Sequence, residues 1–211
     1  MKRMVEKQSD QEELSPMDPP EAYEPPNLEA VPYEEMHPFL QELQDEHKAY
    51  VEKLDTFEEA LLQIQQNGVD RGFEEKLREF FHFFDNEIVK HSQREDKILF
   101  PLLHQRLIEK GEHSQGPAPT TSVNMLEDDH IEAIQLAALS FNFFGLAARL
   151  PDPKSQVMVL DAAINQGKNL IEHLRLHIFR EDNVVFTEAH NHITNEEFDL
   201  MSRGTPKLVH G

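Results

Sequence analysis

The sequence predicts an all-α protein: an antiparallel up-down four-helix bundle with a short C-terminal helix and a disordered, acidic, Pro-rich N-terminal arm. Two observations predict this fold. Four long segments carry apolar residues three or four positions apart, the spacing of one helix face, and no segment alternates as a strand does. One ten-residue pattern also occurs twice, so the chain divides into two related halves of two helices each.

The N-terminal arm is expected to span residues 1–33. The prolines between positions 16 and 26 are too closely spaced for a helix, and the segment has too few apolar residues to form a core. This arm is a candidate binding segment for a protein partner. The bundle is expected over residues 34–192, and residues 193–211 are expected to form the short helix and a disordered tail.

The first half is expected to contain two helices. The first runs from Leu40 to Asn67, and Gly68 ends it because glycine readily takes the left-handed conformation of a helix C-cap. The second begins near Phe73 and continues toward Gly111, where a loop separates the two halves. Polar residues interrupt the apolar stripe of this second helix only in its middle.

The second half repeats this plan. A third helix is expected over residues 122–148. Asp152 has the form of an N-cap before Pro153 and predicts the start of the fourth helix. Thr194 and Glu197 have the spacing of a capping box, so they predict the short final helix.

Composition excludes several classes of function. A formal net charge of −20 argues against nucleic acid and anionic membranes as partners, because both require clustered Lys and Arg. The chain has no Cys, which excludes disulfides, thiolate metal sites and thiol nucleophiles. It also has no apolar run of transmembrane length and no apolar signal region at its N-terminus, so a cytoplasmic location is expected.

The repeated pattern carries metal-binding side chains. Each copy begins with a His, and a Glu follows four positions later on the same helix face. Each half also places a His on the apolar stripe of its preceding helix. The resulting candidate metal ligands are His47, His91, Glu95, His130, His177 and Glu181.

A single His on an apolar stripe is as often a core residue with one hydrogen-bond partner as it is a ligand. Four imidazoles and two carboxylates together are different, because each unpaired buried charge costs roughly several kcal/mol unless a cation is present. The prediction is a two-metal site with His47 and His91 on one ion and His130 and His177 on the other. The two Glu side chains would bridge the ions, and positions remain for solvent, oxygen or an oxo or hydroxo bridge. This donor set suits two iron ions, with manganese or zinc as weaker candidates.

The residues resemble the pattern of the hemerythrin-like, or HHE cation-binding, proteins: His on helix one, H-x-x-x-E on helix two, His on helix three and H-x-x-x-E/D on helix four. The resemblance covers approximately residues 36–192 and implies a four-helix bundle around a non-haem di-iron centre with oxygen-related chemistry. The chain departs from the oxygen carriers, which have a second His one turn along helix three. Here Ile134 and Leu126 stand one turn after and before His130. This departure favours a sensor, redox or iron-handling role over an oxygen carrier.

A ferritin-like oxidase is the rival di-metal bundle. That class uses Glu-x-x-His on two helices and a lone Glu on the others. Among the four candidate ligand His residues only His130 has a Glu three positions before it, in residues 127–130, so the H-x-x-x-E order favours the hemerythrin-like pattern.

Other polar residues have weaker patterns. Glu87 and His173 each stand one turn before a candidate ligand His, so they are further candidate ligands or hydrogen-bond partners of ligands. Arg94 and Arg180 precede the bridging Glu residues and are expected to form ion pairs with the acidic surface. His104 is expected at the surface.

The remaining aromatic and imidazole residues are divided as follows. His190 matches His104 between the halves and is also expected at the surface, and five His residues have no matching pattern: His37, His82, His113, His192 and His210.

The Phe-rich middle of the bundle is expected to be core. Its functional alternative is an apolar sleeve that admits a small neutral gas. It consists of Phe80, Phe81, Phe83, Phe84, Phe141, Phe143 and Phe144.

Three functions remain open from the sequence. The first is a module that binds or senses oxygen, nitric oxide or redox state, or handles iron. The second is an enzyme that acts on peroxide or donates iron for iron–sulfur cluster repair, although the family's repair proteins usually carry a Cys-containing N-terminal region. The third is a structural or zinc-binding bundle. A small gas or peroxide is the expected ligand, and the sequence favours the first function because no general acid or nucleophile is evident beyond the candidate ligands.

Overall fold

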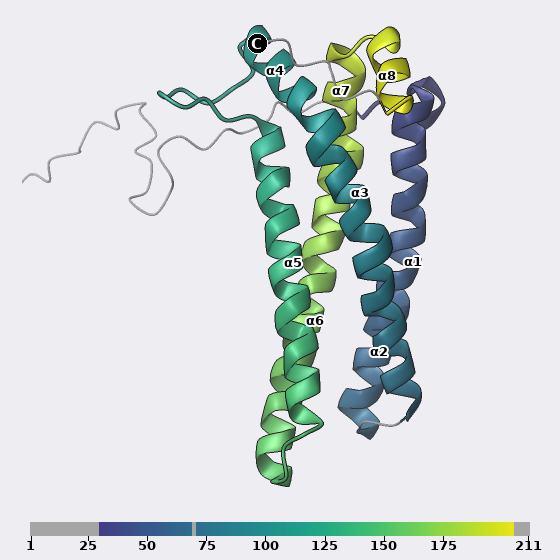
Figure 1. Cartoon of the computed structure of the whole chain (residues 1–211), viewed down its shortest axis with the longest axis vertical. Coiled ribbons are helices and arrows are strands. Elements are labelled where there is room, and N and C mark those ends of the chain that lie inside the picture. Colours follow the sequence, from purple (N-terminus) through teal and green to yellow (C-terminus); the bar gives the residue numbers. More distant parts are fainter. Residues whose placement is uncertain (1–29, 69–70, 205–211) are drawn as a thin grey trace, which may run out of the picture.

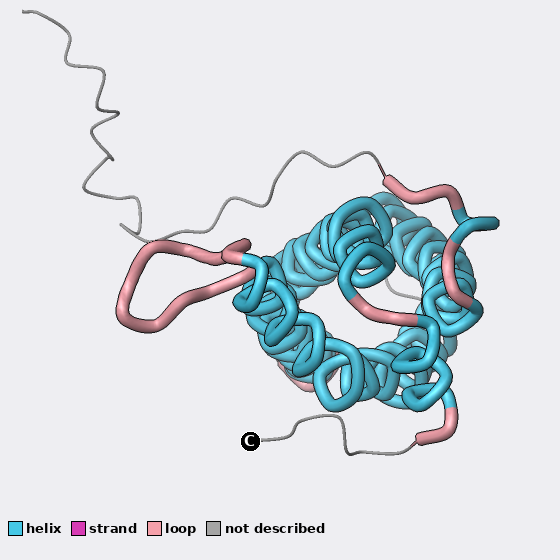
Figure 2. The backbone as a smooth tube through the Cα atoms, turned by 90° about the horizontal axis from the view of Figure 1, so that it is seen from above, coloured by secondary structure: helices cyan, strands magenta, loops and turns pink. Residues whose placement is uncertain are grey.

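The computed structural model describes residues 30–68 and 71–204 of the chain. These residues form an all-α four-helix bundle, as predicted, and none of them forms a strand (Figure 1). Seen from above, the helices surround a common axis (Figure 2). Most of the expected arm and of the expected C-terminal tail lies outside the described residues.

The first rod of the bundle is helix α1 (Pro38–Asn67). His37 caps its start, because Nδ1 of this imidazole accepts the backbone N–H of Phe39 at 3.1 Å. Gly68 ends the helix at the predicted position, but its φ of 81° and ψ of 175° differ from the left-handed conformation that was expected. The His37 ring also stacks on Phe198 at a centroid distance of 5.0 Å, so this imidazole has a structural role that the sequence did not reveal.

The second rod is continuous but not uniformly α-helical. It consists of α2 (Arg71–Phe83), the π-helical turn η2 (Phe84–Ile88), α3 (Val89–Arg94), the π-helical turn η3 (Glu95–Leu99) and α4 (Phe100–Lys110). The sequence predicted one uninterrupted α-helix here. Apolar spacings of three and four do not reveal a π turn, which inserts one extra residue into the rod.

The second half supplies the other two rods. Helix α5 (Ser122–Ala147) forms the third, and α6 (Pro153–Arg180), the π-helical turn η4 (Glu181–Val185) and α7 (Phe186–His192) form the fourth. Asp152 caps α6 as predicted, because its carboxylate accepts the backbone N–H of Ser155 at 2.8 Å.

A short helix closes the upper end of the bundle. Helix α8 (Asn195–Ser202) begins at the predicted capping box, in which Thr194 and Glu197 exchange side-chain and backbone hydrogen bonds. Phe198 and Met201 are its buried residues. Glu197 also receives Arg106 Nη2 at 2.5 Å, which ties this helix to α4.

The N-terminal segment reaches the bundle earlier than expected. The arm was expected to extend through residue 33, but the backbone N–H of Val31 donates to Thr187 Oγ1 at 3.1 Å. A short 3-10 helix, η1 (Tyr33–Glu35), follows. Val31 therefore lies against α7 and Tyr33 lies against α1, and the expected arm up to residue 29 lies outside the described residues.

Two apolar cores lie along the bundle. The lower core includes Leu54 and the stacked rings of Phe57 and Phe80, whose centroids are 3.9 Å apart. The upper core includes Phe100 and Phe186. Buried polar residues separate the two cores, and they include His47, His91, Glu95, His130, His177 and Glu181.

The Phe-rich middle is mainly core, as expected. Phe80, Phe81, Phe84 and Phe144 are buried within the lower core. Phe141 is the exception, since 54% of its surface is exposed even though its ring packs against Phe81.

Candidate metal centre

The six candidate ligands come from all four rods and are all buried. His47 lies on α1, His91 on α3, His130 on α5 and His177 on α6. The two carboxylates begin the π turns η3 and η4. The exposed fraction is 0% for both Glu residues and 2–5% for the imidazoles. The side chains that the sequence repeat marks therefore lie close together in the structure.

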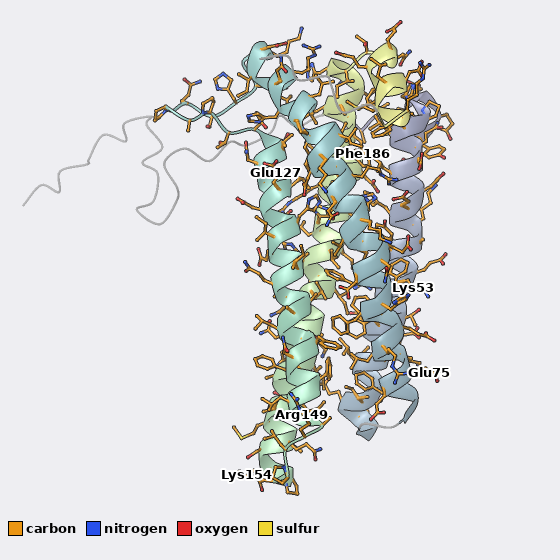
Figure 3. All side chains as sticks on the ribbon, viewed as in Figure 1. Lys53, Glu75, Glu127, Arg149, Lys154 and Phe186 are labelled. Atoms are coloured by element: carbon orange, nitrogen blue, oxygen red, sulfur yellow. The ribbon has the colours of Figure 1, made fainter. Side chains whose placement is uncertain are left out.

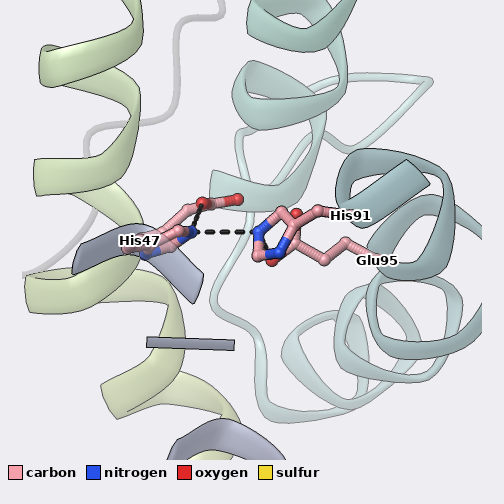
Figure 4. Close-up of side chains that lie close together, drawn as sticks. His47, His91 and Glu95 are labelled. Atoms are coloured by element: carbon pink, nitrogen blue, oxygen red, sulfur yellow. Dashed lines mark hydrogen bonds and ion pairs between the residues drawn. The ribbon is translucent and has the colours of Figure 1, made fainter. Parts of the chain in front are cut away.

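The imidazoles form two facing pairs. His47 Nε2 lies 3.0 Å from His91 Nε2. His130 Nε2 lies 3.2 Å from His177 Nε2. Figure 4 shows the first pair together with Glu95.

Each carboxylate lies against both imidazole pairs. Glu181 Oε2 is 3.1 Å from His47 Nε2 and 3.2 Å from His177 Nε2. Glu95 Oε1 is 3.3 Å from His91 Nε2, and its Oε2 is 3.5 Å from His130 Nε2. The ligand atoms form two overlapping groups, each spanning no more than 4.8 Å, and both carboxylates belong to both groups. This arrangement is the one that two bridging carboxylates require.

The donor atoms fit a cation. None of the four oxygens of Glu95 and Glu181 has a hydrogen-bond partner, although the side chains are fully buried. A buried carboxylate left in this way loses its hydration without compensation. The nearby Nε2 atoms lie at ion-pair distance but are not aligned as donors. A metal between these nitrogens and oxygens would satisfy both.

A second layer of carboxylates contacts the outer nitrogens of the imidazoles. Asp182 Oδ1 lies 2.8 Å from His47 Nδ1, and Asp96 Oδ1 lies 2.8 Å from His130 Nδ1. A carboxylate can only accept, so each Nδ1 carries the hydrogen and each Nε2 keeps a free lone pair in the neutral ring. That tautomer is the one that can bind a metal through Nε2.

The other two imidazoles, His91 and His177, face carboxylates on α1 and α5, which are the first rods of their own halves. Glu46 Oε2 lies 2.7 Å from His91 Nδ1. Asp129 Oδ2 lies 3.6 Å from His177 Nδ1, which forms no hydrogen bond there. The two halves therefore share one plan, but the contact is tighter in the first half.

Arg94 and Arg180 form ion pairs with acidic residues, as expected, and the nearest of these residues belong to the second layer; Arg94 also lies 3.6 Å from the exposed Glu42. Arg94 Nη2 lies 2.5 Å from Glu46 Oε2, and Arg180 Nη1 lies 2.8 Å from Asp129 Oδ2. In both halves an arginine thus orients the carboxylate that faces a candidate ligand. The sequence explains these contacts. Glu46 directly precedes His47 and Asp129 directly precedes His130, and each carboxylate lies beside the helix that carries the arginine.

The electrostatics of the centre favour positive charge. Burial alone would lower the pKa of His47 and His177, but the carboxylates around them raise the pKa of each to about 10. The same balance raises the pKa of His130 to about 9. Burial raises the pKa of Glu46, but His91 and Arg94 outweigh it and bring that pKa down to about 2. A field that stabilises imidazolium also stabilises a metal cation in its place.

The two carboxylates of the inner layer respond in the opposite sense. Burial opposes their ionisation, yet the surrounding imidazoles lower the pKa of both Glu95 and Glu181. Both are therefore available as anionic ligands.

Two further candidate ligands lie elsewhere. Glu87 is exposed and belongs to neither group of ligand atoms. His173 is half-buried, and its Nε2 lies 2.8 Å from the backbone oxygen of Asp129. It therefore contacts a residue of the second layer and not the proposed metal position. Helical register explains the difference, because one turn along a rod moves a side chain out of the polar layer.

The surface positions expected for His104 and His190 are not confirmed. Both are half-buried, and His104 Nδ1 lies 2.9 Å from Thr121 Oγ1 at the start of α5. Neither contributes to the ligand groups.

The positions that would carry a fifth imidazole in an oxygen carrier cannot serve here. Leu126 is fully buried in the upper apolar core, and Ile134 is 49% exposed. Helix α5 therefore supplies one imidazole, as the sequence indicated.

Sequence reasoning missed the second layer, which consists of Glu46, Asp96, Asp129 and Asp182. Each is the immediate neighbour of a candidate ligand, and each has a counterpart in the other half. The repeat contained this signal, because an acidic residue precedes both single His residues and an Asp follows both Glu residues.

A small pocket lies directly beside the imidazoles. His47, His91 and His177 line it together with Tyr50 and Ser92, and apolar side chains close the rest: Leu54, Ile88, Leu174 and Ile178. Its volume of about 10 Å³ leaves room for about one water-sized molecule.

A helical bundle with a buried layer of His and Glu between two apolar cores defines a metal-binding protein of the four-helix class. The family model "Hemerythrin HHE cation binding domain" matches residues 38–189. The chain belongs to this family. None of the helices that the structure describes is long and apolar enough to cross a membrane.

One curated relative is the iron-sulfur cluster repair protein YtfE of Cronobacter sakazakii. It is 27% identical over 122 residues, which cover 58% of this chain and 48% of the relative. The matched part of this chain thus spans about half the length of the relative. No solved structure matches the chain.

Proposed function

We propose that this chain binds two iron ions and uses them to bind or sense a small ligand such as oxygen or nitric oxide. The proposed ligands are His47 and His91 for one ion and His130 and His177 for the other, with both buried Glu side chains shared. The observation that carries the proposal is the set of four carboxylate oxygens without hydrogen-bond partners, placed between two imidazole pairs. Imidazole and carboxylate donors without thiolate suit iron, with manganese or zinc as weaker candidates.

The chain's own residues prepare the centre for this role. Three carboxylates of the second layer, Glu46, Asp96 and Asp182, hold hydrogen on Nδ1 of their imidazoles and direct Nε2 inward, which orients these rings before a metal arrives. The apolar cores above and below exclude water from the layer. When bound, the iron pair would supply a change of oxidation state and open coordination positions.

The small pocket supports a small ligand. Three imidazoles form one wall, and its volume admits about one water-sized molecule. Apart from the imidazoles, the only polar side chains that line it are Tyr50 and Ser92. Binding or sensing is therefore favoured over a reaction that needs a separate general acid.

The test is metal analysis and absorption spectroscopy of protein expressed in iron-replete medium. We expect about two iron ions per chain and near-ultraviolet charge-transfer bands in air. The reduced protein should change its spectrum on exposure to oxygen or nitric oxide and recover when the gas is removed. Rapid turnover of peroxide without any reversible gas response would instead assign the chain to the peroxide-acting enzymes. Protein with zinc or no metal would support a structural bundle.

A second candidate function is donation of iron for iron–sulfur cluster repair. The similarity to the iron-sulfur cluster repair protein of Cronobacter favours it, although this chain has no Cys and matches about half of that protein. We expect such a donor to rebuild the cluster of a metal-free ferredoxin when a sulfide source is present. The matched control is Glu95→Ala protein with the same total iron, which should give only the rate of free ferrous iron. Equal rates with the two proteins would contradict iron donation.

A further inference from the structure

The lower end of the α5–α6 pair differs from the rest of the surface. We define residues 133–171, the facing ends of α5 and α6 with their connection, as the distal tip. Six of the twelve large apolar side chains that are exposed in the described part of the chain lie on it: Ile134 (49%), Leu139 (45%), Phe141 (54%), Leu146 (40%), Val157 (65%) and Met158 (66%). The tip extends below the ends of α1 and α2 (Figure 1). Exposed apolar surface of this extent marks a contact site in a soluble domain.

The tip also forms one wall of a groove. The groove has a volume of about 740 Å³ and opens between α2 and the ends of α5 and α6. Phe141 and Val157 both line it, so the exposed apolar residues of the two helices are continuous across the groove. Phe73 and Phe144, whose ring centroids are 5.2 Å apart, lie at its inner side.

Charge sets the distal tip apart as well. Its 39 residues include three cations, Arg149, Lys154 and Lys168, and two anions, Asp152 and Asp161, which gives a net charge of +1. Arg149 and Lys154 lie at its lower end (Figure 3). The chain as a whole carries −20, and residues 51–90 of the neighbouring helix pair contain ten acidic and five basic residues. The acidic excess is thus absent from the tip.

We propose that the distal tip is a self-association surface, at which two copies of this chain pair about a two-fold axis. Two molecules of charge −20 repel each other strongly, so they can approach with the least electrostatic cost where neither carries the acidic excess. An isologous contact requires a patch that is compatible with itself. An apolar patch with nearly balanced charge has that property.

Other occupants fit the same surface less well. An anionic membrane attracts clusters of Lys and Arg, whereas the three cations of the tip are accompanied by two acids. A strongly acidic partner protein would bind best to a surface with a larger positive charge than the +1 of the distal tip. The distal tip is apolar and nearly neutral, so it is compatible with the distal tip of a second copy of the chain.

Sedimentation equilibrium of the 211-residue chain tests the proposal. We expect a monomer–dimer equilibrium in the micromolar range. The double variant Val157→Glu with Met158→Glu places two charges per copy at the contact, and it should raise the dissociation constant of the dimer by about 30-fold or more. Leu200→Glu is the matched control at the opposite end of the bundle. It should leave the constant unchanged.

Salt gives a second, variant-free measurement. Association through an apolar contact between like-charged molecules should strengthen from 50 to 500 mM NaCl, because salt screens the repulsion. A dimer that weakens over this range would be held by ion pairs, and this would overturn the proposal. A monomer at all concentrations, or a dimer that survives the double variant, would overturn it as well. Cosedimentation of the chain with anionic vesicles but not with itself would assign the tip to membranes instead.

The proposal is independent of the proposed function, because the tip contains none of the candidate metal ligands. Iron content and far-ultraviolet circular dichroism of each variant show whether the bundle has formed. A double variant with normal iron content and no dimer is the expected result.

Discussion

The two halves of the bundle, α1–α4 and α5–α7, carry the same polar layer with different details. Both halves supply a single His, a His with a Glu four positions later, two second-layer carboxylates, an arginine, and a π turn that begins at the Glu. Three of the matched positions at which they differ are Glu46 and Asp129, Tyr50 and Ala133, and Leu102 and Glu188. The shared residues are the ones that a pair of cations requires. The differences make the two proposed metal positions unequal.

The inequality is visible in the second layer. Glu46 is 2.7 Å from its imidazole and also accepts from Tyr50 Oη at 3.3 Å. Asp129 is shorter by one methylene and stays 3.6 Å from His177. We therefore expect the His130 and His177 position to hold its ion less tightly.

The largest effect is expected from removing a shared carboxylate. Glu95→Ala and Glu181→Ala each delete a ligand of both proposed ions, so each variant should lose the charge-transfer bands and most of its iron. Metal analysis after dialysis measures this. The result should be the same for both, since the carboxylates occupy equivalent places in the two halves. Retention of two iron ions by either variant would contradict the bridging assignment.

A smaller effect is expected in the second layer. Glu46→Gln and Asp129→Asn each remove the negative charge that faces an imidazole, and outer partners of this kind are worth about 10–100-fold in metal affinity. Glu46→Gln should fall at the upper end of this range, because its contact is the shorter one. Competition with a chromogenic chelator gives both constants. Equal losses would show that the difference in distance has no energetic meaning.

The third comparison concerns a buried carboxyl in the upper core. Leu102 and Glu188 are matched positions, and both are buried. Burial raises the pKa of Glu188 to about 7, despite a hydrogen bond from Ser122. The group is thus easier to protonate in the folded chain than in the unfolded chain. Its stabilising contribution is complete below about pH 4.5 and is lost as the pH rises through 7.

Glu188→Gln removes that titration. The variant should be more stable than the parent above pH 7 by about 1–3 kcal/mol, and the gain should shrink toward pH 4.5. Thermal unfolding of both proteins at pH 5 and pH 8.5 measures the difference. Glu112→Gln, a change at a nearby charge, is the control and should act only weakly. A gain that does not depend on pH would refute the role of ionisation.

The smallest effect is expected at Tyr50. Tyr50→Phe removes one hydroxyl that donates to Glu46 at 3.3 Å, and a hydrogen bond to a charged group contributes about 1.5–3 kcal/mol to stability when its geometry is good. We expect a loss of threefold or less in metal affinity, because Ala133 fills the matched place in the second half without any hydroxyl. Chelator competition under the conditions used for Glu46→Gln allows direct comparison. A loss as large as that of Glu46→Gln would make Tyr50 part of the essential layer.

Much of the fold was predictable from local chemistry. Asp152, Gly68 and the Thr194–Glu197 capping box act on residues within one turn, so the sequence showed where α6 begins, where α1 ends and where α8 begins. The π turns were not predictable in this way, because the apolar spacing around them is the same as in an α-helix. Two of them, η3 and η4, begin at the two Glu residues whose side chains enter the layer.

The candidate ligands were predictable because the repeat marked them twice. Their partners were harder to identify, because Glu46 and Asp129 contact imidazoles on other helices. Only the packing of α1 against α3, and of α5 against α6, shows which carboxylate faces which ring. His173 and Glu87 illustrate the limit of spacing alone, since a one-turn offset places both outside the ligand groups.

The most direct test of the central claim is a crystal structure of the iron-loaded protein with anomalous data at the iron edge. We predict two iron peaks in the polar layer, one beside His47 and His91 and the other beside His130 and His177. Both Glu95 and Glu181 should contact both peaks. A single iron peak, or iron bound outside this layer, would contradict the account.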